Sequence, residues 1–383
     1  MEKSGGCCSD RARQAGLEGI VAGETAVSTL ADGLRYRGYA IEDLASHASF
    51  EEVAYLVLYG ELPNAKALRQ FQSRLSAAAG VEPRVLEIVR DLPESAPLLD
   101  RLRTGVSLLS HHDPDRAARV TQGRDANLRQ AERLLTQFPM LLAAARCSEN
   151  GPFTPEYDAG RGLAENILRL AGGTAATPRA ISVLNTILIM YADHEFNAST
   201  FTARVVASTL SDLYACIVAA LGALQGPLHG GALERINSAN LEAFESGDPD
   251  AWVRQLLARK QRIMGFGHRV YKQGDIRAQY LQPLCRELAV ETGNERFELA
   301  AEQVELAMMR STGLHPNVDW PSARIFRYLG FSAGTFTPLF AVSRICGWCA
   351  HIIEQQSNNR LIQPRASYIG VAARPFQQMA DRP

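Results

Sequence analysis

Residues 181–200 read ISVLNTILIMYADHEFNAST, and they join a helical core pattern to a polar junction. Apolar side chains recur in this stretch at the spacing of one helix face, from Ile181 to Tyr191. The same period recurs in residues 134–145 and in residues 339–352. There is no repeated strand–helix pattern, glycine-rich dinucleotide fingerprint or internal repeat to suggest another architecture. The sequence therefore predicts a mainly α fold.

Local signals indicate where some of these helices begin and end. Ser49 and Glu52 form a capping box, in which each side chain satisfies a backbone N–H at a helix start. The helix that follows should end at Gly60, because glycine readily takes the left-handed conformation of a helix C-terminus. Thr337 and Pro338 form an N-cap and first-turn pair that predicts the start of a late helix.

Strand signals are sparse, and the clearest lies near the N-terminus. Residues 25–30 and 34–39 are short β-prone runs on either side of Asp32 and Gly33. An Asp-Gly dipeptide between two such runs is typical of a tight hairpin turn. We therefore expect a short N-terminal β-hairpin on an otherwise helical fold.

The bulk composition indicates a globular protein and excludes two classes of partner. The chain has 383 residues, of which 46% are hydrophobic and 21% are charged, so it can bury a large core in two domains. The formal net charge is −1, which provides no global basic field for nucleic acid or an anionic membrane. Any site for an anion must therefore be built locally.

No segment predicts a membrane span or a targeting address. The longest apolar run, residues 213–224, is too short to cross a bilayer. Residues 1–13 have the pattern of neither a signal peptide nor a presequence, and residues 381–383 are not a peroxisomal signal. We expect a cytoplasmic protein.

The seven cysteines do not form the framework of a disulfide-rich domain in a chain of this length. Cys346 and Cys349 form a Cys-x-x-Cys pair, which in some proteins is a redox dithiol. Here the pair lies inside a helical pattern and lacks a preceding buried strand. We predict that both are buried small hydrophobes, with a thiol oxidoreductase as the alternative.

The first segment whose residues could take part in a reaction is the polar junction at the end of residues 181–200. Asp193 and Glu195 flank His194 there. The pattern is not that of a helical zinc site, because Ala198 stands where the second histidine would be. The residues alone allow His194 to be either a ligand contact or a structural hydrogen-bonding group.

The second segment is residues 226–232, GPLHGGA. Its glycines let the backbone approach a bound group closely and leave the imidazole of His229 at the mouth of a cleft. A Gly-Pro break followed by His-Gly-Gly would be costly in a purely structural helix. This segment therefore favours a functional interpretation.

The third segment is residues 264–272, MGFGHRVYK. Gly265 and Gly267 predict a tight loop whose amides can face a ligand, with His268 at its end. Several cationic side chains surround the loop: Lys260, Arg262, Arg269, Lys272 and Arg277. The alternatives are an anion site made of local charge and backbone donors, or a solvated basic loop.

The fourth segment is residues 315–320, HPNVDW. Asp319 is a lone carboxylate between Val318 and Trp320. Partial burial would raise its pKa, as a proton-abstracting base requires. The alternative is an Asx-turn residue with a structural role.

These segments together suit the removal of a weakly acidic proton next to a thioester. That step needs a carboxylate base and a hydrogen-bond donor for the developing enolate oxygen. Histidines can serve the oxygens of both reactants, and arginines suit a di- or tricarboxylate product. The late arginines are Arg344, Arg360 and Arg365. No Cys/His cluster has the spacing of metal ligands, so no metal is expected.

Several motifs in order along the chain resemble the citrate synthase family, over about residues 16–370. They include residues 16–25 (GLEGIVAGET), 36–39 (YRGY) and 102–107 (LRTGVS), together with the four segments above. The resemblance implies an almost wholly helical homodimer with a shared active site. It implies a large domain of residues 1–229 and 330–383 and a mobile smaller domain of residues 230–329.

The resemblance also implies a reaction and a role for each site residue. The reaction is the condensation of acetyl-CoA with oxaloacetate and water to give citrate and CoA. Asp319 would take the acyl α-proton, His229 would stabilise the enol, and His268 would polarise the keto group of oxaloacetate. The implied substrate-binding residues are His194, Arg277, Arg344 and Arg365 of the partner subunit. The implied CoA-binding residues are Arg262, Ile263, Met264, Gly265, Phe266, Gly267, Lys272, Arg310 and Asn317. No cofactor is implied beyond the coenzyme A thioester itself.

Two further possibilities stay open from the sequence. Residues 319–323 and 347–355 also resemble 2-methylcitrate synthases, which use propionyl-CoA with the same catalytic residues. A single extra methyl group discriminates by only about 1–3 kcal/mol in a hydrophobic pocket. The other possibility is a non-catalytic relative that binds a ligand, against which the complete acid–base set argues.

Overall fold

The computed structural model describes residue 17 and residues 19–115, 123–147, 155–268, 271 and 274–382. In this part of the chain the structure is mainly helical, which confirms the predicted fold class. The first ten helices are α1 (Ile41–His47), α2 (Phe50–Tyr59), α3 (Ala65–Ala78), α4 (Pro83–Arg90), α5 (Leu98–His112), α6 (Arg124–Arg146), α7 (Leu163–Leu170), α8 (Pro178–Tyr191), α9 (Ala198–Ser208) and α10 (Leu213–Leu224). The others are α11 (Leu233–Glu245), α12 (Pro249–Ala258), α13 (Ile276–Thr292), α14 (Glu295–Thr312), α15 (Asp319–Tyr328) and α16 (Phe336–Ser357), with short 3-10 turns η3 (Gly230–Ala232), η4 (Ala333–Thr335) and η5 (Met379–Asp381).

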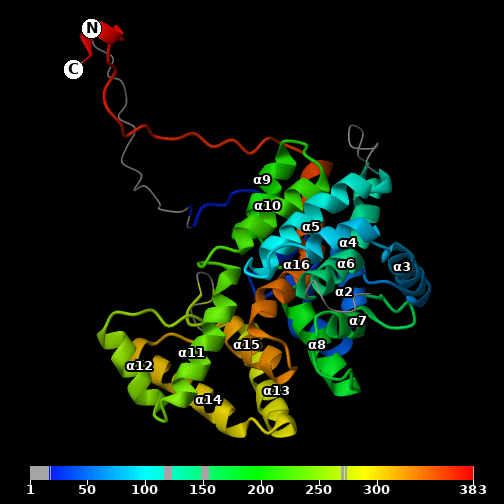
Figure 1. Cartoon of the computed structure of the whole chain (residues 1–383), viewed down its shortest axis with the longest axis vertical. Helices are drawn as coiled ribbons and strands as arrows, with labels where there is room; N and C mark the ends of the chain where they lie inside the picture. Colours follow the sequence, from blue (N-terminus) through cyan, green and yellow to red (C-terminus); the bar gives the residue numbers. More distant parts are fainter. Residues whose placement is uncertain are drawn as a thin grey trace.

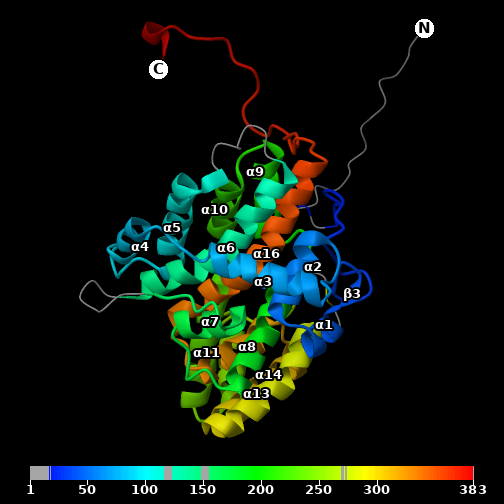
Figure 2. The same ribbon diagram turned by 90° about the vertical axis from the view of Figure 1, so that its right-hand side faces the viewer.

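The helices form two groups (Figures 1 and 2). Helices α11 to α15 pack on one another at one end of the molecule, and the remaining helices gather around α16. The chain passes from the larger group to the smaller between α10 and α11, and returns between α15 and α16. The predicted domain boundaries, at residues 229/230 and 329/330, stay a prediction.

Helix α16 is the core helix of the larger group, where it contacts α2, α6, α8, α9 and α10. By length and composition the stretch Ala333–Ser357 could cross a membrane, but its most apolar window is wholly buried inside the protein. Cys346 and Cys349 are both fully buried in this helix, which confirms that they pack as small hydrophobes. Burial raises the pKa of the Cys346 thiol to about 12. The alternative of a thiol oxidoreductase, which requires a dithiol that solvent can reach, is therefore wrong.

The predicted hairpin is present, and a third strand extends it. Strands β1 (Ser28–Thr29), β2 (Arg35–Tyr36) and β3 (Tyr39–Ala40) form an antiparallel sheet in that order. The strands are shorter than predicted, with Ser28 opposite Tyr36. The hydroxyl of Tyr36 lies 3.0 Å from the carbonyl oxygens of both Ile189 and Asp193. The sheet thereby holds the end of α8 and the junction that follows it.

The helix boundary signals give one confirmation and one correction. The capping box of Ser49 and Glu52 is present, and α2 ends at Gly60 with a φ of 99°. Helix α16 begins at Phe336 with Thr335 as its N-cap residue, so the prediction that Thr337 caps this helix is wrong by two residues. The Thr337 hydroxyl instead lies 2.8 Å from the carbonyl oxygen of Gly230 and joins α16 to η3.

Candidate active site

One cavity of about 140 Å³ brings together the three predicted catalytic residues and three of the four predicted substrate-binding residues. It is lined by His194, Asn197, His229, Gly230, His268, Arg277, Asn317, Val318, Asp319, Phe340 and Arg344. The lining comes from both helix groups, with residues of α13 and α15 on one side and α16 on the other. Three histidines, one carboxylate and two guanidiniums, distant in sequence, therefore face one space.

Asp319 is the first residue of α15 and is partly buried at the cavity wall. The Tyr191 hydroxyl, at the end of α8, donates a 2.7 Å hydrogen bond to Oδ1 of Asp319. Burial raises the pKa of Asp319, and the hydrogen bond from Tyr191 and the charge of Arg277 oppose that shift without cancelling it. The Asx turn in this segment is made by Asn317, whose Oδ1 accepts the Asp319 N–H at 3.1 Å. The Asp319 carboxylate is thus available to act as a base.

His229 lies between α10 and η3, where the chain leaves the larger helix group. Its Nε2 is 2.8 Å from the hydroxyl of Ser199, and the indole N–H of Trp348 donates to the same hydroxyl at 3.1 Å. Burial lowers the pKa of His229 to about 4, with a further contribution from the charge of Arg344. His229 is therefore a neutral imidazole near pH 7 and carries one N–H.

His194 and His268 form a second pair of imidazoles, with ring centroids 5.1 Å apart. The Tyr271 N–H donates to Nδ1 of His268 at 3.1 Å, so the proton of a neutral His268 sits on Nε2. Burial lowers the pKa of His194 well below its ordinary value, and the charge of Arg277 adds to that shift. Nε2 of His194 is buried and has no hydrogen-bond partner among the described residues.

The two arginines in the cavity are both buried, and each is held by contacts with neighbouring residues. Arg277 makes a two-point ion pair with Asp275, with distances of 3.0 and 2.8 Å. Burial alone would lower the pKa of Arg277, but Asp275 raises it above its ordinary value. Nε of Arg344 donates to the Tyr191 carbonyl oxygen at 2.6 Å. Nη1 of Arg344 is buried without a partner in the described part of the chain, so it can donate to an anion in the cavity.

The predicted glycine loop is tight, but its amides do not all face outward. Gly265 and Gly267 have φ values of 91° and 79°. The Gly267 N–H donates to the His315 carbonyl at 2.8 Å, and the Asn317 N–H donates to the Gly265 carbonyl at 2.9 Å. The Gly267 amide is therefore used within the protein, which corrects the expectation that it faces a ligand. The loop is pinned to the segment that carries Asp319.

The comparisons with known proteins point to one family. The family model described as "Citrate synthase, C-terminal domain" matches residues 16–365. The chain is 42% identical to "Citrate synthase 2" of Bacillus subtilis, over 96% of this chain and 98% of that protein. The chain belongs to the citrate synthase family. It is also 40% identical to "2-methylcitrate synthase 2" of Corynebacterium glutamicum, over 96% of this chain and 97% of that protein.

Solved structures from the citrate synthase family share the fold. The chain matches a citrate synthase from Thermoplasma acidophilum, in ternary complex with carboxymethyl coenzyme A and oxaloacetate, with a TM-score of 0.85 and 34% identity. That match covers 96% of this chain and 98% of the other. A citrate synthase from Thermotoga maritima gives a TM-score of 0.83 at 34% identity, over 96% and 99% of the two chains. As a member of the citrate synthase family, the chain is an acyltransferase-type enzyme, as the sequence predicted.

Some residues that the family resemblance assigns lie outside the cavity. The side chains of Arg262 and Arg310 are exposed, and Arg310 forms an ion pair with Asp250. Ile263 and Phe266 are buried, and Phe266 packs on Trp320 with ring centroids 4.6 Å apart. Met264 is half-buried. Arg365 is exposed on the segment that follows α16, and Lys272 lies outside the described residues. Their predicted roles with coenzyme A and oxaloacetate stay predictions.

Several side chains of this site were missed by sequence reasoning. Tyr191 belongs to a helical apolar pattern and was read as core, and Phe340 was not singled out, although Tyr191 contacts Asp319 and Phe340 lines the cavity. Ser199 and Asn197 lie in the quoted junction but have no feature that marks them as polar contacts. One sequence signal could have indicated that Asp275 contacts the site, because it stands two residues before Arg277 at the start of a helix.

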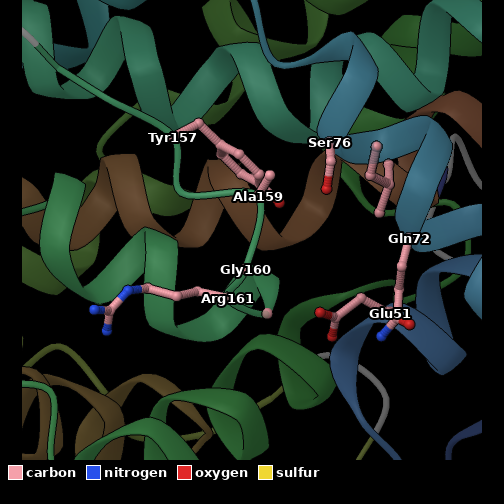
Figure 3. A pocket seen from close by; sticks show the side chains of 9 residues that line it. Glu51, Gln72, Ser76, Tyr157, Ala159, Gly160 and Arg161 are labelled. Carbon is pink, nitrogen blue, oxygen red and sulfur yellow. The ribbon is translucent and has the colours of Figure 1, made fainter.

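A second cavity of about 180 Å³ lies in the larger helix group and contains none of the predicted site residues (Figure 3). Its one buried carboxylate, Glu51, accepts the Leu163 N–H at 2.7 Å and thereby caps α7. Arg161 points away from Glu51 in Figure 3 and pairs with Asp158 instead. The lining residues are Glu51, Gln72, Leu75, Ser76, Tyr157, Ala159, Gly160, Arg161 and Gly162. This cavity has no histidine opposite its carboxylate.

Proposed function

We propose that the chain condenses acetyl-CoA with oxaloacetate and water to give citrate and CoA. The observation that carries the proposal is the convergence of His229, His268 and Asp319 on one cavity with two buried arginines. The Thermoplasma acidophilum structure named above holds carboxymethyl coenzyme A and oxaloacetate, which supports the choice of ligands.

In the proposed first step, Asp319 removes a proton from the α-carbon of the acyl thioester. The raised pKa of Asp319 lies nearer to the high pKa of the α-carbon proton. A smaller pKa difference between acid and base makes proton transfer faster. His229 donates a hydrogen bond to the thioester oxygen and stabilises the enol. For one ring nitrogen of His229 to donate into the cavity, the other, Nε2, must accept the Ser199 proton. The indole N–H of Trp348 donates to the Ser199 oxygen. The one Ser199 proton, which points to Oδ1 of Asn197 at 2.8 Å, would have to turn to His229 in that arrangement.

In the proposed second step, the enol carbon attacks the keto carbon of oxaloacetate. His268 donates from Nε2 to the keto oxygen, because its Nδ1 is occupied by the Tyr271 N–H. The same imidazole then protonates the alkoxide that forms. Hydrolysis of the citryl thioester releases CoA and makes the sequence irreversible.

Oxaloacetate is proposed to bind through His194, Arg277 and Arg344. Among the described residues, Nε2 of His194 and Nη1 of Arg344 are buried nitrogens without partners. A dicarboxylate would satisfy the guanidinium nitrogen, and it would satisfy Nε2 of His194 when the imidazole carries its proton there. Movement of the α11–α15 group over the cavity would then exclude water and complete the acyl site. Oxaloacetate is therefore proposed to bind before the acyl-CoA.

The working enzyme is proposed to be a cytoplasmic homodimer with a shared site. The segment after α16 extends away from the helices in Figure 1 and exposes large apolar side chains, with Tyr368, Ile369 and Phe376 about four-fifths exposed at 78%, 79% and 80%. Such side chains suit burial against a second copy. This segment would bring Arg365 of the partner subunit to the oxaloacetate site.

The proposed reaction uses coenzyme A only as part of its substrate and assigns the chemistry to side chains. Among the described residues there is no group of three or more His, Cys, Asp or Glu arranged to hold a metal ion. Coenzyme A is proposed to lie along the loop of residues 262–267, with Lys272, Arg310 and Asn317.

A second candidate, 2-methylcitrate synthase, differs only in taking propionyl-CoA. It is favoured by the relatives of that name, including the Corynebacterium glutamicum protein and a Shewanella oneidensis protein that is 39% identical. Phe340 lies beside the reacting groups, with its ring centroid 6.1 Å from that of His229. The extra methyl group of a propionyl donor would contact this part of the wall.

The test is CoA thiol release with oxaloacetate and either acetyl-CoA or propionyl-CoA. We expect turnover with both and a higher kcat/KM for acetyl-CoA. A preference for propionyl-CoA would replace the first candidate by the second. Binding of oxaloacetate with no thiol release from either donor at saturating concentration would contradict both.

A further inference from the structure

Tyr191 makes two contacts that the proposed reaction does not yet use. Its hydroxyl donates to Oδ1 of Asp319 at 2.7 Å, and its carbonyl oxygen accepts from Nε of Arg344 at 2.6 Å. Its ring packs edge-on against Phe340, with centroids 4.6 Å apart, and the guanidinium of Arg344 lies 4.6 Å from the same Phe340 ring. One fully buried residue therefore links the proposed base to the proposed oxaloacetate site.

The hydrogen bond also joins the two helix groups. Tyr191 is the last residue of α8, in the larger group, whereas Asp319 is the first residue of α15, in the smaller group. The Tyr191 end of the bond is fixed, because the Tyr36 hydroxyl and the Arg344 side chain both contact the α8 terminus or the junction after it. The bond therefore depends on how the smaller group sits on the larger one.

We propose that Tyr191 is a positioning residue for Asp319, which holds Oδ1 of the carboxylate so that Oδ2 faces the acyl carbon when the two helix groups are together. This inference rests on the proposed function and adds a residue to it. The phenol remains protonated at neutral pH, since burial and the nearby Asp319 charge raise its pKa well above the ordinary value. It can therefore only donate to the carboxylate in this pair.

The alternative is a buried tyrosine that merely satisfies its own hydroxyl. The pH dependence of catalysis separates the two, because the phenol hydrogen bond lowers the pKa of Asp319. Other charges that act on Asp319 would be unchanged by removal of the hydroxyl. They come from Arg277 and Asp275 at the start of α13 and from Arg344 on α16, while His194, His229 and His268 share the cavity.

The test is Tyr191→Phe, which removes one oxygen and keeps the ring. With saturating oxaloacetate, we expect kcat for thiol release to fall by about 10-fold, and the KM for oxaloacetate to stay within about twofold. The acid limb of kcat/KM for the acyl-CoA should move to higher pH by about one unit, because Asp319 loses the bond that favours its charged form.

The matched control is Tyr214→Phe. Tyr214 is a buried tyrosine that also donates to a buried carboxylate, Asp113 at 2.5 Å, away from the cavity. This variant should lose stability while keeping the kcat and pH limb of the parent. A purely structural Tyr191 would give the same result as the control.

Three outcomes overturn the inference or separate it from the proposed function. A folded Tyr191→Phe enzyme with the parental kcat and acid limb overturns it. A Tyr191→Phe chain that cannot be obtained folded indicates a structural role and equally overturns it. A parent chain that condenses neither acyl donor instead contradicts the proposed function on which the inference rests.

Discussion

The two cavities each contain one carboxylate with a raised pKa, yet only one has the surroundings of a catalytic site. Glu51 accepts a hydrogen bond from the Leu163 N–H and caps the start of α7. Asp319 accepts a hydrogen bond from the Tyr191 hydroxyl and shares its cavity with three histidines. Burial produces the pKa shift in both places. A shifted carboxylate therefore does not identify a catalytic base unless donors for the reacting oxygens stand across from it.

The cavities also differ in how their arginines are held. Arg277 and Arg344 are buried in the wall of the Asp319 cavity, and one nitrogen of Arg344 has no partner among the described residues. Arg161, at the Glu51 cavity, turns to the surface and pairs with Asp158 and Glu165. Burying a guanidinium without a full set of partners is costly, so it points to an anionic ligand.

The largest expected difference between the cavities is in catalysis. Asp319→Asn should lower kcat for condensation by about 10²- to 10⁴-fold, the range supplied by a general base, because only proton abstraction loses its acceptor. Oxaloacetate should still bind, since its proposed ligands are unchanged. Thiol-release kinetics and calorimetric titration with oxaloacetate measure the two effects.

Glu51→Gln is the matched control for that substitution. It also replaces a buried carboxylate by an amide of the same shape, and the amide oxygen can still accept the Leu163 N–H. We expect kcat within about twofold of the parent. Equal losses in the two variants would remove the distinction between the cavities.

The next largest effect should be on oxaloacetate affinity. Arg344→Lys keeps the charge but removes the planar fork that reaches the Tyr191 carbonyl and the ligand together. The Kd for oxaloacetate should rise by about 10- to 100-fold. Arg161→Lys at the other cavity should leave that Kd unchanged, and a parental affinity in Arg344→Lys would exclude Arg344 from the substrate site.

Glu51→Ala should affect stability without affecting catalysis. The substitution leaves the buried N–H of Leu163 at the start of α7 without an acceptor. The free energy of unfolding should fall by about 1–3 kcal/mol, as measured by urea denaturation. A marked loss of kcat in the folded variant would instead give the Glu51 cavity a part in the reaction.

The smallest effect concerns pH. The reaction needs Asp319 charged and His229 neutral, so activity is lost as the pH falls through the raised pKa of Asp319. Burial lowers the pKa of His229 to about 4, so His229 is neutral near pH 7. We expect kcat/KM to fall on the acid side of its pH profile, and we expect this fall to occur at the same pH in Glu51→Gln as in the parent. A limb displaced in Glu51→Gln would show that the two carboxylates are coupled.

The sequence was sufficient for the features that are local or strongly periodic. The capping box at Ser49, the turn at Gly60 and the apolar pattern of α16 depend on residues within a few positions of one another. The start of α16 was misplaced, because both Thr335 and Thr337 have the chemistry of a cap. The third strand, Tyr39–Ala40, is too short to show any alternation.

The candidate site was predictable only as far as its residue types and the family resemblance allowed. His229, His268 and Asp319 stand out because imidazoles beside glycines, or a carboxylate between apolar residues, are unusual in a core. Tyr191 and Ser199 do not stand out, because their roles come from partners 128 and 30 residues away in the chain. Such contacts depend on tertiary packing, which no local pattern records.

A crystal structure of the chain with oxaloacetate and carboxymethyl coenzyme A tests the central claim most directly. We expect the thioester-side carboxymethyl group between Asp319 and His229, and the keto oxygen of oxaloacetate within hydrogen-bonding distance of Nε2 of His268. Arg277 and Arg344 should contact the oxaloacetate carboxylates. Ligands bound in the cavity beside Glu51, or reacting groups in separate pockets, would contradict the proposed site.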